Sequence, residues 1–321
     1  MTTNFVGTDE LQDLKKLNPI VAILGETATG KSALGLWLAS QFNGEIINAD
    51  SRQVYRGMDI GTNKPTLAEQ ASIRHHLLNI VDPDEEFSLA QFLPKAHCAI
   101  NEIISNKKLP IVVGGTGQYL WGLLEGWLPP KVPPDLKLRH SLGKILSEKG
   151  AQALYVLLQN SDPIAAKKIH PNNTRRIIRA LEVQSKLGIT FSKAKQKSPI
   201  GNPILIIGVT APNRNELYRW IDVRLKSMLN AGWMKEVQDL IDAGYSLDLP
   251  SLTSLGYRDL AKFIRGKHAF VDMMQNLQRS HRRLSRQQRT WFKLNDSRIH
   301  WIIPDKEGYE HANRMVQRFI L

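Results

Sequence analysis

The sequence predicts an α/β fold, in which a parallel sheet flanked by helices forms a core and an all-helical insertion domain interrupts it. Two observations predict the core: short apolar runs alternate with helical patterns, and a glycine-rich octapeptide follows the first run. Strands that alternate with helices are typical of βαβ units and of a parallel sheet. A third observation predicts the insertion, because the alternation stops over residues 129–199 and only helical patterns remain there.

The octapeptide at residues 25–32 reads GETATGKS and lies between the apolar run 20–24 and a helical pattern over 31–42. A phosphate-binding loop requires this strand, loop and helix setting. Glycine lets the backbone wrap around an anion, and successive N–H groups, the helix N-terminus and Lys31 attract it. We therefore expect a P-loop NTPase-like core, with the Ser32 hydroxyl placed to bind Mg²⁺. The predicted diphosphate-binding residues are Gly25, Ala28, Thr29, Gly30, Lys31 and Ser32.

The other elements of the core follow in chain order. The predicted strands are residues 20–24, 45–48, 110–113 and 204–209. The predicted helices are residues 31–42, 88–106, 118–124, 213–229, 233–243 and 271–292. Asn213 provides a start signal for one of these helices and Gly232 a stop signal. The core is expected to be discontinuous and to comprise residues 17–128 and 200–321.

The segment 129–199 is expected to be the helical insertion. It opens with Pro129-Pro130 and Pro133-Pro134, which make a stiff exit from the core. Inside it, Asp162-Pro163 is typical of a helix start, and Gly188 stops a predicted helix over 175–187.

The formal net charge of +13 is concentrated in two segments. Residues 131–200 carry a net charge of +10 and residues 279–298 a net charge of +6. Such confinement is typical of a surface that binds a polyanion, although a solvated lysine-rich surface gives the same pattern. In the helix predicted over 271–292, one stripe is expected to face the core: Leu277, Leu284 and Trp291. A second stripe is basic: Arg279, Arg283, Arg286, Arg289 and Lys293.

Composition also excludes some classes of protein. Cys98 is the only cysteine, which excludes a disulfide framework and a thiolate zinc site. No stretch has the roughly 18 uncharged apolar residues of a membrane span, and the N-terminus lacks the order of a signal peptide. We expect a cytoplasmic monomer without a membrane partner.

Asp50 is the candidate catalytic carboxylate. NTP hydrolases hold magnesium with an acid at a strand end, but the strand 110–113 ends in Gly114-Gly115-Thr116. Asp50 instead follows the strand 45–48, and ligands bind at strand ends in open α/β sheets. This suits a reaction in which diphosphate leaves and Asp50 takes a proton from the nucleophile. A role as metal ligand or helix cap remains open for Asp50. An NTP-dependent kinase, favoured only by the loop, and a non-catalytic RNA-binding module are the alternative functions.

Eight motifs together make the chain resemble the tRNA dimethylallyltransferases. They occur in the order of that family over essentially the whole chain, and the motif GMDIGTNKP is far more specific than the phosphate loop. The motifs lie at residues 25–32, 50–55, 57–65, 75–77, 114–119, 162–183, 256–258 and 290–292.

The resemblance implies transfer of a dimethylallyl group from dimethylallyl diphosphate to N6 of the adenosine 3′ of the tRNA anticodon. It implies that Asp50 accepts the N6 proton, that Thr116 hydrogen-bonds the adenine, and that Arg224 and Thr27 contact the diphosphate. The expected cofactor is Mg²⁺, and the expected partner is the tRNA anticodon stem-loop. The tRNA-binding residues that the resemblance implies are Asp50, Ser51, Arg52, Gln53, Thr116, Arg175, Arg176, Arg179, Gly256, Tyr257, Arg258, Arg286, Gln288 and Arg289.

Two positions depart from the family pattern. Glu26 stands where family members usually have proline, so a carboxylate lies in the phosphate loop. Gln287 stands where the family commonly has a basic residue, so no tRNA contact is carried over to it.

Overall fold

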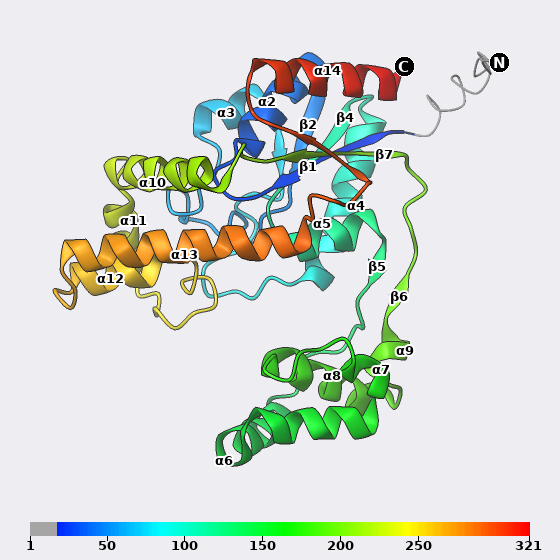
Figure 1. Ribbon diagram of the computed structural model, residues 1–321, viewed down its shortest axis with the longest axis vertical. Coiled ribbons are helices and arrows are strands. Elements are labelled where there is room, and N and C mark those ends of the chain that lie inside the picture. The colour runs from blue at the N-terminus through cyan, green and yellow to red at the C-terminus, as the bar shows by residue number, and fades with distance from the viewer. Residues whose placement is uncertain (1–17) are drawn as a thin grey trace. The chain divides into compact units, whose positions relative to one another are not determined.

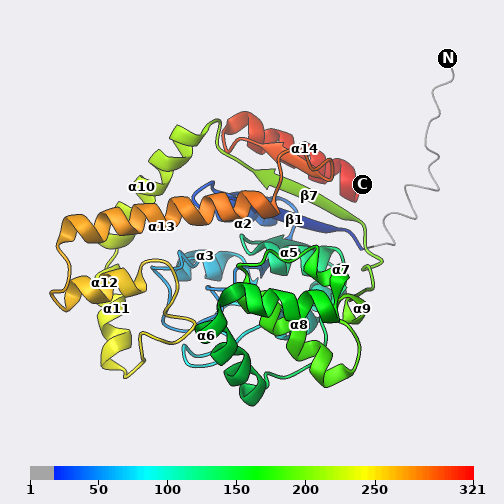
Figure 2. The same ribbon diagram turned by 60° about the horizontal axis from the view of Figure 1, so that its bottom comes forward.

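The computed structural model describes residues 18–321, which divide into two compact units (Figures 1 and 2). The core unit comprises the described residues up to 124 together with 200–321, and the helical unit comprises residues 125–199. The helical unit begins before the predicted residue 129, because strand β5 (Trp127–Leu128) pairs antiparallel with β6 (Gln196–Lys197). Residue 17, the predicted start of the core, lies outside the described residues.

The core unit contains a parallel sheet, which confirms the predicted α/β class. Its strand order is β3-β2-β4-β1-β7-β8, and the central strand β1 is buried along its whole length. Two strands were not predicted, because β3 has only two residues and β8 includes the exposed His300. The strands are β1 (Ile20–Gly25), β2 (Gly44–Asn48), β3 (His75–His76), β4 (Leu109–Val113), β7 (Ile204–Val209) and β8 (Ile299–Ile302).

Helices cover both faces of this sheet. Figure 1 shows α2 and α14 on one side and α4 and α5 on the other. Leu34 and Leu38 of α2 belong to one hydrophobic cluster with Val21 of β1 and Val316 of α14. The helices of the core unit are α2 (Lys31–Gln41), α3 (Leu67–Ser72), α4 (Leu89–Ser105), α5 (Gly117–Leu124), α10 (Arg214–Asn230), α11 (Trp233–Asp242), α12 (Tyr257–Ile264), α13 (Phe270–Trp291) and α14 (Lys306–Ile320).

Helices α10 to α13 form a second hydrophobic cluster together with the segment that follows β2. Trp233, Tyr257 and Leu277 are fully buried in it, and Met58 joins them from that segment. Burying large aromatic and aliphatic side chains is the main stabilising contribution here, at about 1.5–3 kcal/mol for each aliphatic side chain. The cluster therefore fixes α10 and α13 to the loops at the carboxyl ends of the strands.

The helical unit has a hydrophobic core of its own, with Leu154, Leu158 and Ile177 fully buried. Asp162 caps α7 by accepting a hydrogen bond from the N–H of Ala165, and Gly188 ends α8 in the left-handed conformation. Its helices are α6 (Leu136–Ser161), α7 (Pro163–Ala166), α8 (Thr174–Leu187) and α9 (Phe191–Ala194). Across residues 18–321, no helix is both long enough and apolar enough to cross a bilayer.

A candidate active site at the phosphate loop

The phosphate loop joins β1 to α2 through residues whose backbone favours glycine. Gly25 and Gly30 have φ angles of 145° and 83°, and a Cβ on Gly25 would lie 2.2 Å from the carbonyl oxygen of Val209. The loop is closed internally on the carbonyl oxygen of Glu26, which accepts hydrogen bonds from Thr29 Oγ1 at 2.9 Å and Lys31 Nζ at 2.5 Å. Its shape is therefore set before any anion binds.

Helix α13 anchors the same loop from outside. Gln288 is buried, its Oε1 accepts a hydrogen bond from the N–H of Thr27 at 2.7 Å, and its Nε2 donates to the carbonyl of Gly115 at 3.0 Å. A Cβ on Gly115 would lie 2.4 Å from that amide nitrogen, so a larger residue there would displace the Gln288 amide from its two hydrogen bonds. Next along the helix, Arg289 Nη2 lies 2.6 Å from Glu26 Oε2.

A cavity of about 440 Å³ opens at the loop. Among the described residues that line it, Asp50 is the only carboxylate. Residues from several elements meet there, because α2, α10, α13 and the ends of β2 and β4 all reach it. The lining includes Thr27, Lys31, Ser32, Asn48, Asp50, Ser51, Arg52, Gln53, Thr116, Arg224, His281, Leu284, Gln287, Gln288 and Trp291.

Besides Arg52, two basic side chains face this cavity, Lys31 and Arg224. Burial lowers the pKa of Lys31 to about 7, and the neighbouring Arg224 guanidinium contributes to the lowering. Asp50 acts in the opposite direction on the pKa of Lys31. Burial also lowers the pKa of Arg224, and Asp50 again opposes it. Arg224 Nε is buried and has no hydrogen-bond partner within the described chain, so its N–H is available for an anion.

Asp50 is held at the cavity by its own turn. Its Oδ1 accepts a hydrogen bond from the N–H of Arg52 at 2.9 Å, and its N–H donates to Asn48 Oδ1 at 3.0 Å. Thr116 Oγ1 accepts a hydrogen bond from the N–H of Ser51 at 2.9 Å and donates to Ser51 Oγ at 3.2 Å. A hydroxyl oxygen has two acceptor positions, so one on Thr116 stays available.

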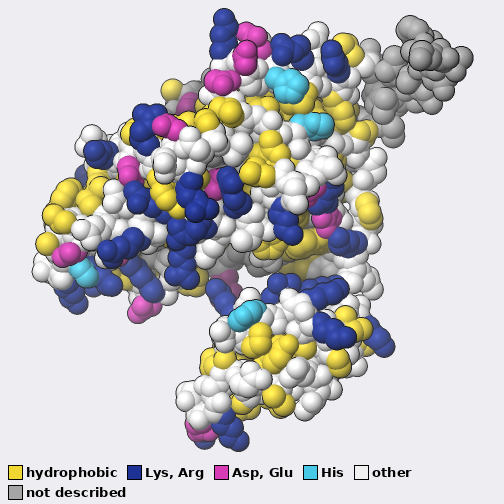
Figure 3. Space-filling model, in the orientation of Figure 1, with side chains coloured by type: hydrophobic (Ala, Val, Ile, Leu, Met, Phe, Trp, Pro, Cys, Tyr) yellow, Lys and Arg dark blue, Asp and Glu magenta, His cyan; other side chains and the backbone are white. Residues whose placement is uncertain are grey.

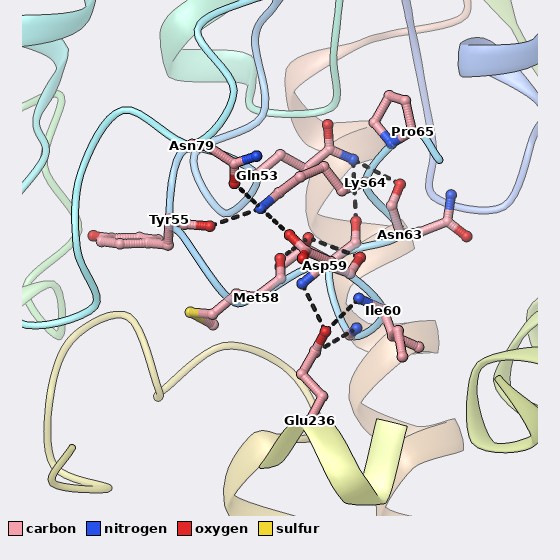
Figure 4. Close-up of polar contacts among 12 residues, drawn as sticks. Gln53, Tyr55, Met58, Asp59, Ile60, Asn63, Lys64, Pro65, Asn79 and Glu236 are labelled. Atoms are coloured by element: carbon pink, nitrogen blue, oxygen red, sulfur yellow. Dashed lines mark hydrogen bonds and ion pairs between the residues drawn. The ribbon is translucent and has the colours of Figure 1, made fainter. Parts of the chain in front are cut away.

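The family-specific segment 57–65 forms one wall of the cavity, and a carboxylate that sequence reasoning missed holds it (Figure 4). Glu236 of α11 accepts hydrogen bonds from the N–H groups of Asp59, Ile60 and Gly61 at 2.7, 2.6 and 3.0 Å. The hydroxyl of Tyr257 donates to the same carboxylate at 2.7 Å. The three N–H groups come from consecutive residues, which no local pattern around Glu236 could indicate.

The buried Lys64 ties the C-terminal end of segment 57–65 to Tyr55 and Asn79, which lie on either side of it in the sequence. Its Nζ donates to the carbonyl of Tyr55 at 2.7 Å and to Asn79 Oδ1 at 2.5 Å, and it pairs with the Asp59 carboxylate (Figure 4). Gln53 Nε2 adds a hydrogen bond to the carbonyl of Asn63 at 2.9 Å. The conformation of the cavity wall is therefore fixed by hydrogen bonds from side chains in three parts of the chain.

Helix α13 meets the cavity with a stripe that differs from the prediction. Leu277 is buried as expected, but Trp291 is exposed and lines the cavity, so the predicted core stripe is wrong at its C-terminal end. The buried positions there are His281, Ser285 and Gln288. Burial lowers the pKa of His281 to about 4, which keeps its ring neutral. Polar residues at helical spacing were the signal that could have found this stripe.

The predicted RNA-binding residues of the core unit fall into two groups. Arg286 is exposed on α13, and Figure 3 shows Lys and Arg side chains gathered over this helix. Tyr257 is fully buried, and a Cβ on Gly256 would lie 2.1 Å from the Trp233 ring. Gly256 and Tyr257 are therefore not accessible to RNA in this structure, because both are packed between α11 and α12. Arg258 is exposed and donates to the carbonyl of Leu247.

The helical unit divides its predicted arginines in the same way. Arg175 and Arg176 are exposed near the start of α8. Arg179 is half-buried and pairs with Glu182, whose carboxylate is fully buried and also pairs with Arg139. Arg179 Nη2 donates to the carbonyl of Val132 at 2.9 Å. Arg179 therefore holds the helical unit together, which leaves Arg175 and Arg176 as the exposed pair.

The oxygen donors near the loop suit magnesium bound partly through a substrate. In the described part of the chain, no group of three or more His, Cys, Asp or Glu side chains could hold a metal ion. Ser32 and Asp50 both line the cavity. Magnesium keeps several waters and often binds through one or two protein ligands together with substrate phosphates. This sparse donor set fits such an ion.

Comparison with known families agrees with the site. The family model described as IPP transferase matches residues 53–295. The chain belongs to the IPP transferase family. This confirms the family that the sequence motifs indicated, and the matched residues include Asp59–Gly61, Thr116, Arg224 and Glu236.

Named relatives in this family cover nearly the whole chain. The chain is 43% identical to a tRNA dimethylallyltransferase of Dehalococcoides mccartyi over 95% of its own length and 93% of the relative. It is 47% identical to one of Roseiflexus castenholzii, over 86% of this chain and 90% of that one.

Solved structures in the family show the same fold. The tRNA isopentenylpyrophosphate transferase of Bacillus halodurans is 35% identical, covers 94% of this chain and 97% of its own, and has a TM-score of 0.69. A eukaryotic dimethylallyltransferase solved acting on tRNA is 28% identical, with a TM-score of 0.78 over 94% of this chain and 77% of its own.

Proposed function

We propose that this protein transfers the dimethylallyl group of dimethylallyl diphosphate to N6 of the adenosine 3′ of the anticodon in tRNA. One observation carries the proposal: a phosphate loop, three basic side chains and, among the described lining residues, a single carboxylate meet in one cavity. The names of its relatives in the IPP transferase family support the same activity. A kinase would need an acid at the end of β4, where the described chain has Gly114 and Gly115 instead.

The electrophilic half of the reaction belongs to the loop. The bond between the allylic carbon and the diphosphate oxygen breaks, and the negative charge develops on the leaving diphosphate. Lys31, the Arg224 guanidinium and the loop N–H groups stabilise that charge, since preorganised donors act most strongly in a cavity of low dielectric constant. The N–H of Thr27 is not among these donors, because Gln288 accepts it.

The nucleophilic half belongs to the turn after β2. The N6 nitrogen forms the new bond to the allylic carbon, and its proton passes to Asp50 as general base. The free acceptor position of Thr116 Oγ1 accepts a hydrogen bond from the second N6–H group, which stays on the nitrogen. An exocyclic adenine amine is a weak nucleophile, so positioning both of its hydrogens favours attack. To reach this turn, the base has to leave the stack of the anticodon loop.

The expected Mg²⁺ would be held by the Ser32 hydroxyl together with the diphosphate, and it would supply additional stabilisation of the leaving charge. The RNA backbone would be bound by exposed arginines, namely Arg286 on α13 and Arg175 and Arg176 on α8. Contacts with phosphates make affinity strongly dependent on salt.

A transfer assay tests the proposal. The purified protein is incubated with Mg²⁺, unmodified tRNA and dimethylallyl diphosphate labelled in the allyl group. Label should appear in the RNA and be released by digestion as N6-dimethylallyladenosine. A matched tRNA with guanosine in place of the target adenosine should stay unlabelled. Absence of transfer, together with release of phosphate from ATP, would instead indicate the kinase.

A further inference from the structure

Glu26 is an acid within the phosphate loop, and the structure shows where its side chain lies. The residue is only 5% exposed, so it does not point to solvent. Its Oε2 lies 2.6 Å from Nη2 of Arg289 on α13, and the same nitrogen lies 3.4 Å from Thr210 Oγ1 after β7. The acid therefore forms an ion pair with a residue that the sequence assigned to RNA binding.

This pair affects the charge that an incoming diphosphate meets. A carboxylate in the loop repels a phosphate anion unless a nearby cation compensates it. The Arg289 guanidinium lies 2.6 Å from the Glu26 carboxylate, so its positive charge compensates the acid. Removing the arginine alone leaves an uncompensated buried charge, whereas removing both charges leaves none. The two residues are thus coupled electrostatically.

The pair also fixes the geometry of the loop. The backbone carbonyl of Glu26 accepts the hydrogen bonds from Lys31 and Thr29. The residue before Arg289, Gln288, holds the N–H of Thr27. Two successive residues of α13 therefore hold two successive residues of the loop, and the loop lysine binds the carbonyl of one of them.

We propose that Arg289 is a positioning residue for the diphosphate, acting by neutralising and fixing Glu26. This revises the expectation that Arg289 binds RNA, and it rests on the proposed function. Arg286 offers a matched contrast on the same helix, because it is exposed and contacts the hydroxyl of Tyr218. Its guanidinium compensates no acid in the loop, so its loss should affect RNA alone.

Titration calorimetry with dimethylallyl diphosphate and with inorganic diphosphate, each with Mg²⁺, measures the loop directly. Arg289→Ala should weaken binding of both about tenfold, as expected for one uncompensated charge nearby. In the double variant Glu26→Gln with Arg289→Ala, the affinity for diphosphate should recover to within about threefold of the wild-type value, because the repelling charge is gone. Arg286→Ala should leave diphosphate binding unchanged and raise the KM for tRNA.

Three outcomes would overturn the proposal. The first is an Arg289→Ala variant that binds diphosphate normally but raises the KM for tRNA. The second is a double variant that binds as weakly as Arg289→Ala. The third is an Arg286→Ala variant that weakens diphosphate binding as much as Arg289→Ala does. If the wild-type protein did not modify tRNA, the proposed function would be wrong, but the calorimetry would still decide the role of Arg289.

Discussion

The cavity and the helical unit both carry more basic side chains than acidic ones, but they hold them in opposite ways. In the cavity, Lys31 and Arg224 are half-buried, desolvation lowers the pKa of each, and both face one carboxylate, Asp50. In the helical unit, Arg175 and Arg176 are exposed, while the half-buried Arg179 is paired with Glu182. Desolvated basic groups with little compensation raise the free energy of the protein, so an anion that binds between Lys31 and Arg224 is favoured.

The two regions can discriminate between anions to different degrees. A buried cation without a full set of partners gains most from an anion that reaches it in one geometry, as the diphosphate does in the proposed reaction. Exposed arginines in water gain little from any single geometry, and together they attract a polyanion over a distance. Substitutions that remove a charge from one region should therefore leave the function of the other region unchanged.

The largest effect is expected at Asp50. Asp50→Ala should lower kcat about a thousandfold, because it removes the general base, while tRNA binding should remain. Asp50→Asn keeps the shape of the side chain and should show the same loss. Single-turnover transfer assays and filter binding of tRNA measure the two properties separately. A near-normal rate in either variant would remove Asp50 from the mechanism.

A smaller effect is expected at Arg224. Arg224→Ala should lower kcat/KM for dimethylallyl diphosphate about a hundredfold, since one charged donor to the leaving group is lost. Arg224→Lys should recover only part of it, because Lys cannot reproduce the guanidinium geometry. Lys226→Ala, an exposed position on the same helix, is the control and should retain normal steady-state kinetics. Equal losses for Arg224→Ala and Lys226→Ala would contradict a specific role.

Diphosphate binding in the cavity should depend on pH. The pKa of Lys31 is lowered to about 7, so in the free protein the side chain loses its proton as the pH rises through that value. Binding a diphosphate favours the protonated form. The affinity should therefore fall above neutral pH, by at most about tenfold per unit, with uptake of a proton.

Calorimetry in buffers of different ionisation enthalpy measures that proton uptake. Lys31→Arg is the matched variant, because arginine stays charged over this range and should show a flat profile. An unmodified protein with no proton uptake above neutral pH would show that Lys31 binds the diphosphate without a change in its charge.

The smallest effect is expected in the helical unit. Arg175→Ala with Arg176→Ala should weaken tRNA binding several-fold and reduce the slope of log affinity against log salt by up to about 2. Diphosphate binding should not change. Arg179→Ala should instead lower the melting temperature, because the buried Glu182 loses a partner. A salt slope that changes only in Arg179→Ala would reverse these assignments.

The phosphate loop and Asp50 could be recognised from the sequence, because their signals are local. The octapeptide is flanked by its strand and helix, and Asp50 directly follows an apolar run. The family motifs added Arg224, and the structure brings all three parts to one cavity. The core strands were predicted where they form apolar runs, whereas β3 and β8 form none.

The contacts that hold the site together could not be predicted, because they join distant parts of the chain. Gln288 meets Thr27 across 261 residues, and Glu236 meets Gly61 across 175. The family resemblance assigned Gln288 and Tyr257 to RNA, although the side chain of each is buried and already hydrogen-bonded. A residue type indicates which bonds it can form, but only the fold determines its partner.

The antiparallel pair formed by β5 and β6 means that the chain enters and leaves the helical unit at adjacent points. A segment whose two ends lie side by side can be deleted and replaced by a short linker, and the strand order of the sheet does not change. The paired strands β5 and β6 would therefore let the core unit accept insertions of different size in place of the helical unit. The ancestry of such a protein can therefore be modular even though its chemistry resides wholly in the other part.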